Sequence, residues 1–563
     1  MSPSTGGASA EIAPPSLSAA SPSTPSLPLV SPLERRRRDL ETLARERWEL
    51  LIVGGGIVGC GILLDATSRG LRAALVEQDD VAVGTSSRSS RLIHGGLRYL
   101  EQFHVSLVRE ALAERAHLLR LAPHLVHLEQ LLFPVYGVPA AHRAFYGSGL
   151  AFYDLLGARR EGGRARHLGL EATLELAPPL RRRSLRGGIV YHDGVADDAR
   201  YTLAVLRTAQ RMGALALTRV RASAALVEGD RLVGLRVHDV LGGADLDVLA
   251  ERVVDATGVW AARPANPFGP ASVRLRPSRG THLVVPRERI PVATGMTIRI
   301  PHKVLFLVPW PRFWLIGATD DPDDGSPDRP HATPADVDGL LRLVNETLQV
   351  DLGRGDLVGT FAGLRPLVGD AEGGSTVAAS REHRVWCEPS GLVRIGGGKY
   401  TTYRIMARDA VDASLGDEAG RRPSATAELP LVGAATAPRL ARLAADLQRQ
   451  HGLRADLVES LVARHGTEAA AVLAAGGAIA LGTDGARLEA EVTWAAREEL
   501  ALSLDDVLAR RLRLAMELPD RGLAVAPRVA RLLGEVLGWD AAREAREVEG
   551  YLASAHREYD VPA

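Results

Sequence analysis

The sequence ELLIVGGGIVGC, residues 49–60, decides the fold of this chain. Residues 49–53 form a short apolar run that ends in glycines, which is the pattern of a buried parallel strand. Residues 57–69 have the apolar spacing of a helix, and residues 72–76 (RAALV) form a second apolar run. Together these segments predict a β-α-β unit of about 30 residues.

Three spaced glycines, Gly54, Gly56 and Gly59, fit the pattern G-x-G-x-x-G between the first strand and the helix. The first allows a tight turn, the second lets the backbone approach a pyrophosphate, and the third lets helix and strand pack closely. The diphosphate is expected at the positive N-terminus of the helix. Glu77 closes the second strand, where a carboxylate can accept hydrogen bonds from an adenosine ribose. This unit predicts a dinucleotide site but does not separate NAD from FAD.

Three later segments favour FAD. Residues 84–98, GTSSRSSRLIHGGLR, supply hydroxyls, arginines and glycines for a loop around the phosphates and the flavin. Residues 253–258 (VVDATG) and 393–399 (VRIGGGK) each have the pattern of a strand that returns to the nucleotide domain. An FAD domain with an inserted substrate domain requires such distant returns, whereas an NAD domain is more often contiguous.

Composition narrows the class of protein. The 563 residues allow more than one domain, and 46% hydrophobic with 24% charged residues is ordinary for a globular chain. Lys+Arg and Asp+Glu both number 68, so the bulk charge gives no support for nucleic-acid binding. Cys60 and Cys387 are the only cysteines, which argues against a disulfide framework or a four-ligand zinc site and fits a reducing, cytoplasmic compartment. No apolar run reaches about 18 residues, so we expect a protein that is soluble or lies on a membrane.

The rest of the chain divides into a tail, a mixed middle and a helical end. Residues 1–45 are predicted to be a disordered tail, because the first 32 residues hold seven prolines among small polar residues. The arginine run at residues 35–38 is interpreted as a solvated linker, with contact to anionic lipid as the alternative. We expect the oxidoreductase unit over residues 46–430 and a helical domain over residues 431–563. Further predicted elements are helices over residues 106–121, 436–465 and 486–518 and strands over residues 232–237 and 246–254.

Several motifs in a fixed order resemble the FAD-dependent glycerol-3-phosphate dehydrogenases. They are TSSRSSRLIHGGLRYLE (85–101), HDGVADDAR (192–200), FAGLRPL (361–367) and GGGKYTTYR (396–404), supported by residues 280–286, 304–310 and 315–320. The likeness runs from about residue 48 to beyond residue 515, where residues 490–514 look like the family's C-terminal cap. The chain departs from the family pattern at Val58, Leu512 and Tyr400, which leaves the choice of substrate slightly open.

The resemblance implies an α/β fold: an FAD-binding Rossmann-like domain of the glutathione-reductase and D-amino-acid-oxidase type, with an inserted β-rich substrate domain and a helical C-terminal cap. It implies oxidation of sn-glycerol 3-phosphate to dihydroxyacetone phosphate by hydride transfer to FAD, with electrons passed to a quinone at the cytoplasmic face of a membrane. Oxygen as acceptor, another small alcohol or amine as substrate, and a non-catalytic FAD scaffold stay open as alternatives. Dimerisation, partner docking and membrane contact all stay open as roles of the cap.

A phosphorylated polyol needs several fixed cations in its site, preferably arginines that bind oxygens in pairs. The resemblance supplies them, and a scaffold would not need charges aimed at a substrate. Removing the hydroxyl proton needs a base, for which His94 and His282 are both candidates, although either could instead orient a neighbour or the flavin. A cation such as Lys399 could also stabilise the reduced flavin anion. The expected catalytic residues are His94, Arg98, His282 and Arg365, and the expected substrate-binding residues are Tyr99, Arg381 and Lys399.

The expected cofactor site draws on the same segments. We expect no metal site, because Pro322 interrupts the aspartates around residue 321 and no later glutamate completes a calcium loop, so this stretch predicts a turn. The expected FAD-binding residues are Gly54, Gly55, Gly56, Ile57, Gly59, Glu77, Thr85, Ser86, Ser89, Leu92, Thr257, Gly258, Gly397, Gly398 and Thr401.

Overall fold

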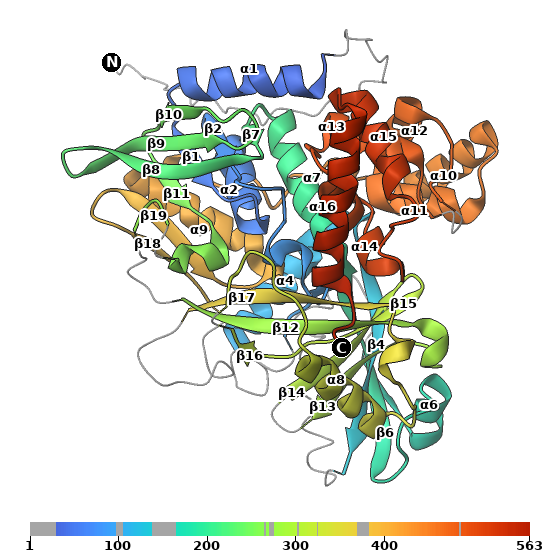
Figure 1. Ribbon diagram of the computed structural model, residues 1–563. Helices are drawn as coiled ribbons and strands as arrows, with labels where there is room; N and C mark the ends of the chain where they lie inside the picture. Colours follow the sequence, from blue (N-terminus) through green and yellow to red (C-terminus); the bar gives the residue numbers. More distant parts are fainter. Residues whose placement is uncertain are drawn as a thin grey trace, which may run out of the picture.

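The computed structural model describes residues 30–96, 105–137, 165–263, 266–269, 275–300, 303–323, 325–368, 382–482 and 486–563. Figure 1 shows a nucleotide-binding part built on β1, β2 and α2, a β-rich part below it, and a helical domain in orange and red on its right. Three of the predicted site residues, Arg98, Tyr99 and Arg381, lie outside the described residues.

The predicted β-α-β unit forms the centre of a parallel sheet. Strand β1 (Leu50–Val53) pairs in parallel with β2 (Ala73–Val76) on one side and with β11 (Val253–Asp255) on the other. Strand β19 (Leu392–Gly397) pairs in parallel with β11, which confirms both distant returns predicted from the sequence. Every residue of β1 and β2 is buried, as expected where both faces of a sheet are covered. The outer strands are β7 (Leu215–Leu217) beside β2 and antiparallel β18 (His383–Cys387) beside β19.

Helices cover one face of this sheet and a small sheet covers the other. Helices α2 (Ile57–Ser68), α7 (Asp198–Arg211) and α9 (Tyr403–Leu415) share one apolar core with the strands. The opposite face packs against a three-stranded antiparallel sheet in the order β10-β9-β8. The single strand predicted over residues 246–254 is wrong in one respect, because it divides into β10 and β11, which belong to different sheets. The strands of the small sheet are β8 (Val220–Glu228), β9 (Arg231–Asp239) and β10 (Asp245–Leu249).

The prediction of a disordered tail is wrong for residues 32–45, which form helix α1 (Pro32–Arg45). Ser31 caps this helix through its hydroxyl, and Pro32 occupies the first turn, where a missing N–H costs no helical hydrogen bond. The helix lies along β10 and β7 at the top of Figure 1. A proline-rich segment therefore ends at the first turn of a helix that packs on the domain.

The arginine run within α1 is not a solvated linker throughout. Arg36 is only 8% exposed, and its guanidinium donates a 2.5 Å hydrogen bond to the carboxylate of Asp239 at the end of β9. Leu43, further along the same face of α1, is fully buried. A long-range ion pair and an apolar contact thus outweigh the tendency of this polar segment to stay solvated. The exposed arginines of the run are Arg35, Arg37 and Arg38.

The middle of the chain builds a larger sheet in the order β16-β12-β15-β14-β13-β4-β6-β3, with β17 also paired to β12 and β5 to β6. Its pairs are antiparallel except for β13 with β4. Helices α6 (Leu170–Leu176) and α8 (Pro334–Thr347) pack on one face, and the C-terminal helices pack on the other. The strands are β3 (Leu92–Ile93), β4 (Val126–Tyr136), β5 (Arg166–Leu168), β6 (Leu185–Ala196), β12 (Leu275–Pro286), β13 (Gly295–Ile300), β14 (Lys303–Trp310), β15 (Phe313–Gly317), β16 (Asp321–Pro322) and β17 (Gly359–Val368).

The chain beyond residue 430 is helical, as predicted, but the two long helices are interrupted. The first stops at Gly452, which has the left-handed φ of +63° that suits glycine at a helix end. The second divides into α13, a π-helical turn η8 (Asp506–Arg511) and the short α14. The helix predicted over residues 106–121 is confirmed as α4 (Val105–Leu121). Among the helices that the structure describes, none is both long and apolar enough to cross a membrane. The C-terminal helices are α10 (Ala437–His451), α11 (Ala455–His465), α12 (Ala469–Gly476), α13 (Glu489–Glu498), α14 (Leu514–Glu517), α15 (Ala526–Leu537) and α16 (Ala541–Tyr559).

Candidate active site

A cavity of about 830 Å³ lies between the parallel sheet and the larger sheet. Its wall includes the carboxyl ends of β1, β2, β11 and β19, which is where ligands bind in parallel α/β sheets. Strands β6, β12, β13, β14 and β17 supply the opposite wall. The predicted site residues that line this cavity are Gly54, Gly56, Ile57, Glu77, Thr85, Ser86, Ser89, Leu92, His94, Thr257, Gly258, His282, Arg365, Gly397, Gly398, Lys399 and Thr401.

The glycine turn after β1 leaves no room for side chains. A Cβ on Gly54, which has φ +113°, would lie 2.7 Å from the carbonyl oxygen of Ala256. A Cβ on Gly59 would lie 1.9 Å from the carbonyl oxygen of Gly54, so only glycine lets α2 approach β1 this closely. Two predicted residues, Gly55 and Gly59, are absent from the cavity wall and serve the turn itself. At Gly56 a Cβ would meet only the hydroxyl of Ser86, at 3.2 Å, so the backbone here is open to a ligand.

The start of α2 suits an anion. Its first turn contains no acidic side chain, and the N-terminus of a helix carries a partial positive charge. The N–H of Ile57 donates a 2.9 Å hydrogen bond to the hydroxyl of Ser86, which lines the same wall. A diphosphate at this position would meet backbone N–H groups and a hydroxyl, and the first turn of α2 brings no acidic side chain to it.

Glu77 is fixed at the end of β2 by the backbone. The N–H groups of Gly55 and Asp79 donate hydrogen bonds of 2.6 and 2.8 Å to its two carboxylate oxygens. The side chain is buried, and burial raises the pKa of Glu77 to about 7, although the hydrogen bond from Gly55 opposes this. The carboxyl group that the sequence predicts for the ribose therefore changes its charge near neutral pH.

The segment after β2 is tied to three elements around the cavity. The Thr85 hydroxyl donates to the carbonyl oxygen of Leu364 on β17. The N–H and the hydroxyl of Ser89 donate to one carboxylate oxygen of Asp198, at 2.9 and 2.7 Å. Ser90 is hydrogen-bonded to Nε2 of His282 on β12, at 2.8 Å. This segment thus reaches from the glycine turn to a candidate base.

Two turns at the strand ends complete the nucleotide side. The N–H and hydroxyl of Thr257 donate to a carboxylate oxygen of Asp255, at 3.0 and 2.6 Å, which fixes the turn after β11. After β19, Gly397 and Gly398 both have positive φ, and a Cβ on Gly398 would lie 2.4 Å from the sulfur of Met406. These residues keep the backbone close to the cavity, as a phosphate or a flavin edge requires.

The two candidate bases lie in different surroundings. His282 is 2% exposed, and its ring stacks on Phe361 with centroids 4.7 Å apart. Burial, followed by the charges of Arg365 and Arg91, lowers the pKa of His282 to about 3, so the ring is neutral at physiological pH. His94 is less buried, and its ring lies edge-on to Phe306 with centroids 5.9 Å apart. Its backbone N–H donates a 3.3 Å hydrogen bond to the Thr401 hydroxyl. Both histidines line the cavity.

Cations from separate strands meet near these histidines. Arg365 on β17 donates to the carbonyl oxygen of Thr319 at 3.0 Å and lies 3.6 Å from a carboxylate oxygen of Asp320. Lys399 caps the 3₁₀ turn η5 (Tyr400–Thr402) and lines the same wall. Arg299 on β13 also lines the cavity. These three positive side chains, among the several that line the cavity, come from positions up to 100 residues apart in the sequence.

Sequence reasoning missed several residues of this wall. Ser90, Thr319 and Asp193 all lie within motifs that the sequence made visible, but no role was assigned to them. Their hydrogen-bonding side chains next to predicted site residues could have singled them out. Arg299 gave no signal, because one arginine in a strand of an arginine-rich chain has the pattern of a surface charge.

The comparisons with known proteins agree with this geometry. The family model described as FAD dependent oxidoreductase matches residues 49–404, and the model of the C-terminal domain of alpha-glycerophosphate oxidase matches residues 424–544. Glycerol-3-phosphate dehydrogenase 2 of Mycobacterium tuberculosis is 43% identical over 524 residues, which cover 92% of this chain and 89% of that protein. This chain belongs to the FAD-dependent glycerol-3-phosphate dehydrogenase family. The resemblance predicted from the motifs is therefore confirmed.

Further members of the family extend the likeness. Glycerol-3-phosphate dehydrogenase of Mycobacterium leprae is 42% identical over 533 residues, which cover 93% of this chain and 91% of that protein. The crystal structure of glycerol-3-phosphate dehydrogenase from Bacillus halodurans, complexed with FAD, superposes with a TM-score of 0.76 at 27% identity, covering 94% of this chain and 98% of that chain. The predicted fold class and the predicted cofactor, FAD, are both confirmed for this family member. The glycine turn, the open backbone at Gly56 and the anion-compatible start of α2 fit the cofactor's diphosphate.

Proposed function

We propose that this protein oxidises sn-glycerol 3-phosphate to dihydroxyacetone phosphate with bound FAD as the hydride acceptor. Relatives named glycerol-3-phosphate dehydrogenase, aligned over about nine-tenths of their length, support the substrate. The observation that carries the proposal is the meeting of Arg365, Lys399 and two histidines in the cavity that begins at the glycine turn. A cavity for an uncharged alcohol would not need these cations.

We assign binding of the substrate phosphate to Arg365 and Lys399. A guanidinium presents paired N–H donors to phosphate oxygens, and an ammonium adds a compact charge. Arg365 is held toward the cavity by its hydrogen bond to Thr319, so little side-chain freedom is lost when the phosphate binds. Arg98, Tyr99 and Arg381 are proposed to complete this phosphate site on the strength of their motifs.

We assign removal of the hydroxyl proton to His282. Its neutral ring can accept a proton, and the hydrogen bond to Ser90 together with the stack on Phe361 fixes its orientation. Because Arg365 and Arg91 lower the pKa of His282, a bound phosphate dianion that offsets their charge raises this pKa and strengthens the base. His94, on the less buried side of the cavity, is the competing candidate.

The cofactor supplies the redox chemistry, since bound FAD accepts the hydride from the carbinol carbon. The protein's part is to hold both reactants together and to place positive charge where negative charge develops. Lys399, next to the glycines after β19, is proposed to stabilise the negative charge of the reduced cofactor in addition to binding phosphate.

For the second half of the cycle we propose a quinone as electron acceptor, with peripheral contact to the cytoplasmic face of a membrane and a homodimer as the assembly. Oxygen is the second candidate acceptor, because the matching C-terminal model is described from an alpha-glycerophosphate oxidase. A soluble quinone and oxygen, each offered alone to the purified protein with glycerol 3-phosphate, separate the two. Turnover with quinone but not with oxygen supports the dehydrogenase, and the reverse result supports the oxidase.

A matched pair of variants tests the phosphate site. Arg365→Gln removes a charge from the cavity, whereas Arg454→Gln removes one that is 62% exposed and paired with Asp456 on the helical domain. Loss of a charge-assisted hydrogen bond of about 1.5–3 kcal/mol lowers kcat/KM for glycerol 3-phosphate by about 10- to 150-fold in R365Q. R454Q should behave like the wild type. Equal activity of the wild type on glycerol and on glycerol 3-phosphate would contradict the proposal.

A further inference from the structure

Arginines of the C-terminal domain form hydrogen bonds and ion pairs with the segment that lines the cofactor cavity. We define residues 79–91 as the cofactor loop, since several of its residues, from Gly84 to Ser90, line the cavity. On its far side this loop meets Arg510, Arg511 and Arg513, which come from η8 and the turn before α14. Within the described residues, none of these three arginines lines the cavity itself.

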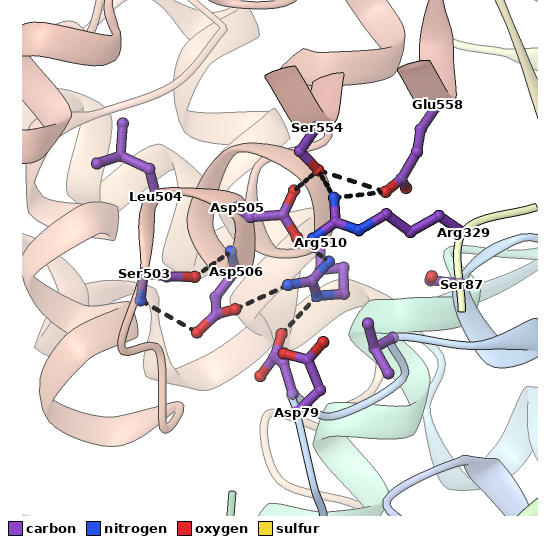
Figure 2. A network of polar contacts seen from close by, with 12 residues as sticks. Asp79, Ser87, Arg329, Ser503, Leu504, Asp505, Asp506, Arg510, Ser554 and Glu558 are labelled. Carbon is purple, nitrogen blue, oxygen red and sulfur yellow. Dashed lines mark hydrogen bonds and ion pairs between the residues drawn. The ribbon is translucent and has the colours of Figure 1, made fainter. Parts of the chain in front are cut away.

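Asp80 at the start of the cofactor loop holds two of these arginines. The guanidinium of Arg511 donates to both of its carboxylate oxygens, at 2.6 and 2.8 Å, which is the paired geometry that arginine makes with carboxylates. Arg510 donates its Nε–H to the same carboxylate and its other N–H groups to Asp505 and Asp506. Asp80 is fully buried, so these contacts are shielded from solvent. Figure 2 shows Arg510 with Asp505 and Asp506, to which its guanidinium is bonded.

Arg513 reaches the loop in two ways. One of its N–H groups donates to the carbonyl oxygen of Ser87, at 3.1 Å. Another donates to Asp198, whose second carboxylate oxygen accepts both hydrogen bonds from Ser89. Arg513 also has φ +63°, a conformation that non-glycine residues keep only where their surroundings require it. A continuous chain of contacts thus runs from the helical domain to a cavity-lining serine.

The last helix, α16, also contacts the side of the cofactor loop that faces away from the cavity. Arg88 of the cofactor loop donates to the carboxylate of Glu558 on α16, which also lies 3.1 Å from Arg329. Ser554, one turn earlier on α16, is hydrogen-bonded to Asp505 at 3.3 Å. Figure 2 shows Ser554, Glu558, Arg329 and Asp505 in one cluster at the end of the helix. Segments from residue 88 to residue 558 therefore share one network behind the loop, which is buried at Arg88 and Glu558.

We propose that Arg511 and Arg513 are positioning residues of the FAD site, so that the C-terminal domain sets the affinity for FAD by fixing the cofactor loop. The proposal rests on the cavity being the FAD site. The loop also carries Ser90, which is bonded to His282, and loosening it moves the candidate base as well. A helical domain that only added stability would change unfolding without changing either property of the folded protein.

Arg513→Gln tests this role against a matched control in the same domain. Arg464 is 9% exposed and pairs with Glu491 at 2.7 Å, wholly among the C-terminal helices, so Arg464→Gln breaks a buried ion pair without touching the loop. FAD is added to each apoprotein and the dissociation constant is read from the quenching of its fluorescence. We expect R513Q to bind FAD at least about tenfold more weakly, equivalent to about 1.4 kcal/mol, and to lose kcat with KM for glycerol 3-phosphate nearly unchanged. R464Q should lower the melting temperature but keep the wild-type FAD affinity.

Two outcomes would overturn the proposal. The first is a folded R513Q whose dissociation constant for FAD lies within twofold of the wild-type value. The second is an R464Q that binds FAD as weakly as R513Q does. If R513Q does not fold, Arg513→Lys is the second variant, which keeps the positive charge but lacks the paired N–H donors of a guanidinium. Hydrogen exchange of the backbone amides of residues 79–91 in FAD-bound R513K should then be faster than in the wild type. Unchanged exchange would equally refute the role.

A third variant separates this inference from the proposed function. Gly56→Val fills the backbone opening at the glycine turn. Wild-type FAD affinity in G56V would mean that the cavity is not the cofactor site, and the proposed function would fail with it. Loss of FAD in G56V together with normal affinity in R513Q would reject the positioning role alone.

Discussion

Glu77→Gln should remove a pH dependence from FAD binding. Burial raises the pKa of Glu77 to about 7 in the FAD-free protein, and ribose hydroxyls that donate to the carboxylate favour its ionised form. FAD binding therefore releases a proton below neutral pH. At pH about 5.5, roughly 1.5 units below this pKa, only about 3% of the carboxyl groups are ionised, so FAD should bind about 30-fold more weakly than at pH about 8.5.

FAD affinity should rise with pH, whereas the contribution of Glu77 to the stability of the FAD-free protein should fall with pH. The folded state holds the Glu77 proton more tightly than the unfolded state, whose pKa is near 4.5. Between these two values the folded state binds more protons, so the contribution of Glu77 to stability falls as the pH rises from about 4.5 through about 7. Saturating FAD lowers the pKa of Glu77 and should remove this loss.

The assay is a titration of apoprotein with FAD at several pH values, followed by flavin fluorescence. E77Q should bind FAD with the same affinity at each pH, and more weakly than the wild type above neutral pH. Glu49→Gln is the matched control, since Glu49 caps the other end of the sheet through the N–H of Arg72 and is absent from the cavity wall. A wild type with pH-independent affinity, or an E77Q that keeps the wild-type dependence, would refute the reasoning.

Three further predictions concern packing, the N-terminal helix and the base. Gly59→Ala places a Cβ 1.9 Å from a backbone oxygen and should destabilise the protein by about 3 kcal/mol in chemical denaturation. Arg36→Ala leaves the carboxylate of its ion pair buried and unpaired, which should cost about 3–5 kcal/mol in the same assay. Arg365→Gln removes a positive charge that lowers the pKa of His282, so the acid limb of the kcat/KM profile should move to higher pH, toward about 6.5.

Each of these predictions has a control. Gly339 lies in α8 with open space around its Cβ position, so Gly339→Ala should be neutral or slightly stabilising. Arg37 is 63% exposed, and Arg37→Ala should change stability by less than about 1 kcal/mol. An acid limb that moves with His94→Gln but is unaffected by R365Q would transfer the role of base from His282 to His94. Equal stability of R36A and R37A would show that α1 is not bound as described.

The parts of the fold that rest on local pattern could be predicted from the sequence. The apolar runs of β1 and β2 and the glycines between them are encoded within 30 consecutive residues, and the glycine spacing follows from how closely Gly54 and Gly59 approach. The late returns β11 and β19 carry the same pattern of a buried strand followed by glycine. Motifs around His94, His282, Arg365 and Lys399 led to one cavity. His94 and Lys399 follow strands β3 and β19, and His282 and Arg365 lie on the paired strands β12 and β17 that form its opposite wall.

What the sequence did not predict depends on partners far along the chain. Helix α1 is held by Arg36 and Asp239, 203 residues apart, and no local pattern reveals that pair. Arg511 and Arg513 bind carboxylates more than 300 positions away, and no local pattern distinguishes them from the many other arginines of the chain. The interruption at Gly452 could have been noticed, since glycine at that position ends the helix with positive φ.

The most direct test of the central claim is the reduction of the bound flavin by glycerol 3-phosphate without oxygen. The yellow, FAD-loaded protein is mixed anaerobically with sn-glycerol 3-phosphate, glycerol or lactate, and the visible absorbance of the flavin is followed. Rapid bleaching by glycerol 3-phosphate alone is the predicted result, with dihydroxyacetone phosphate formed in proportion to the flavin. An FAD-loaded protein that keeps its colour with glycerol 3-phosphate, or bleaches equally fast with glycerol, would contradict the account.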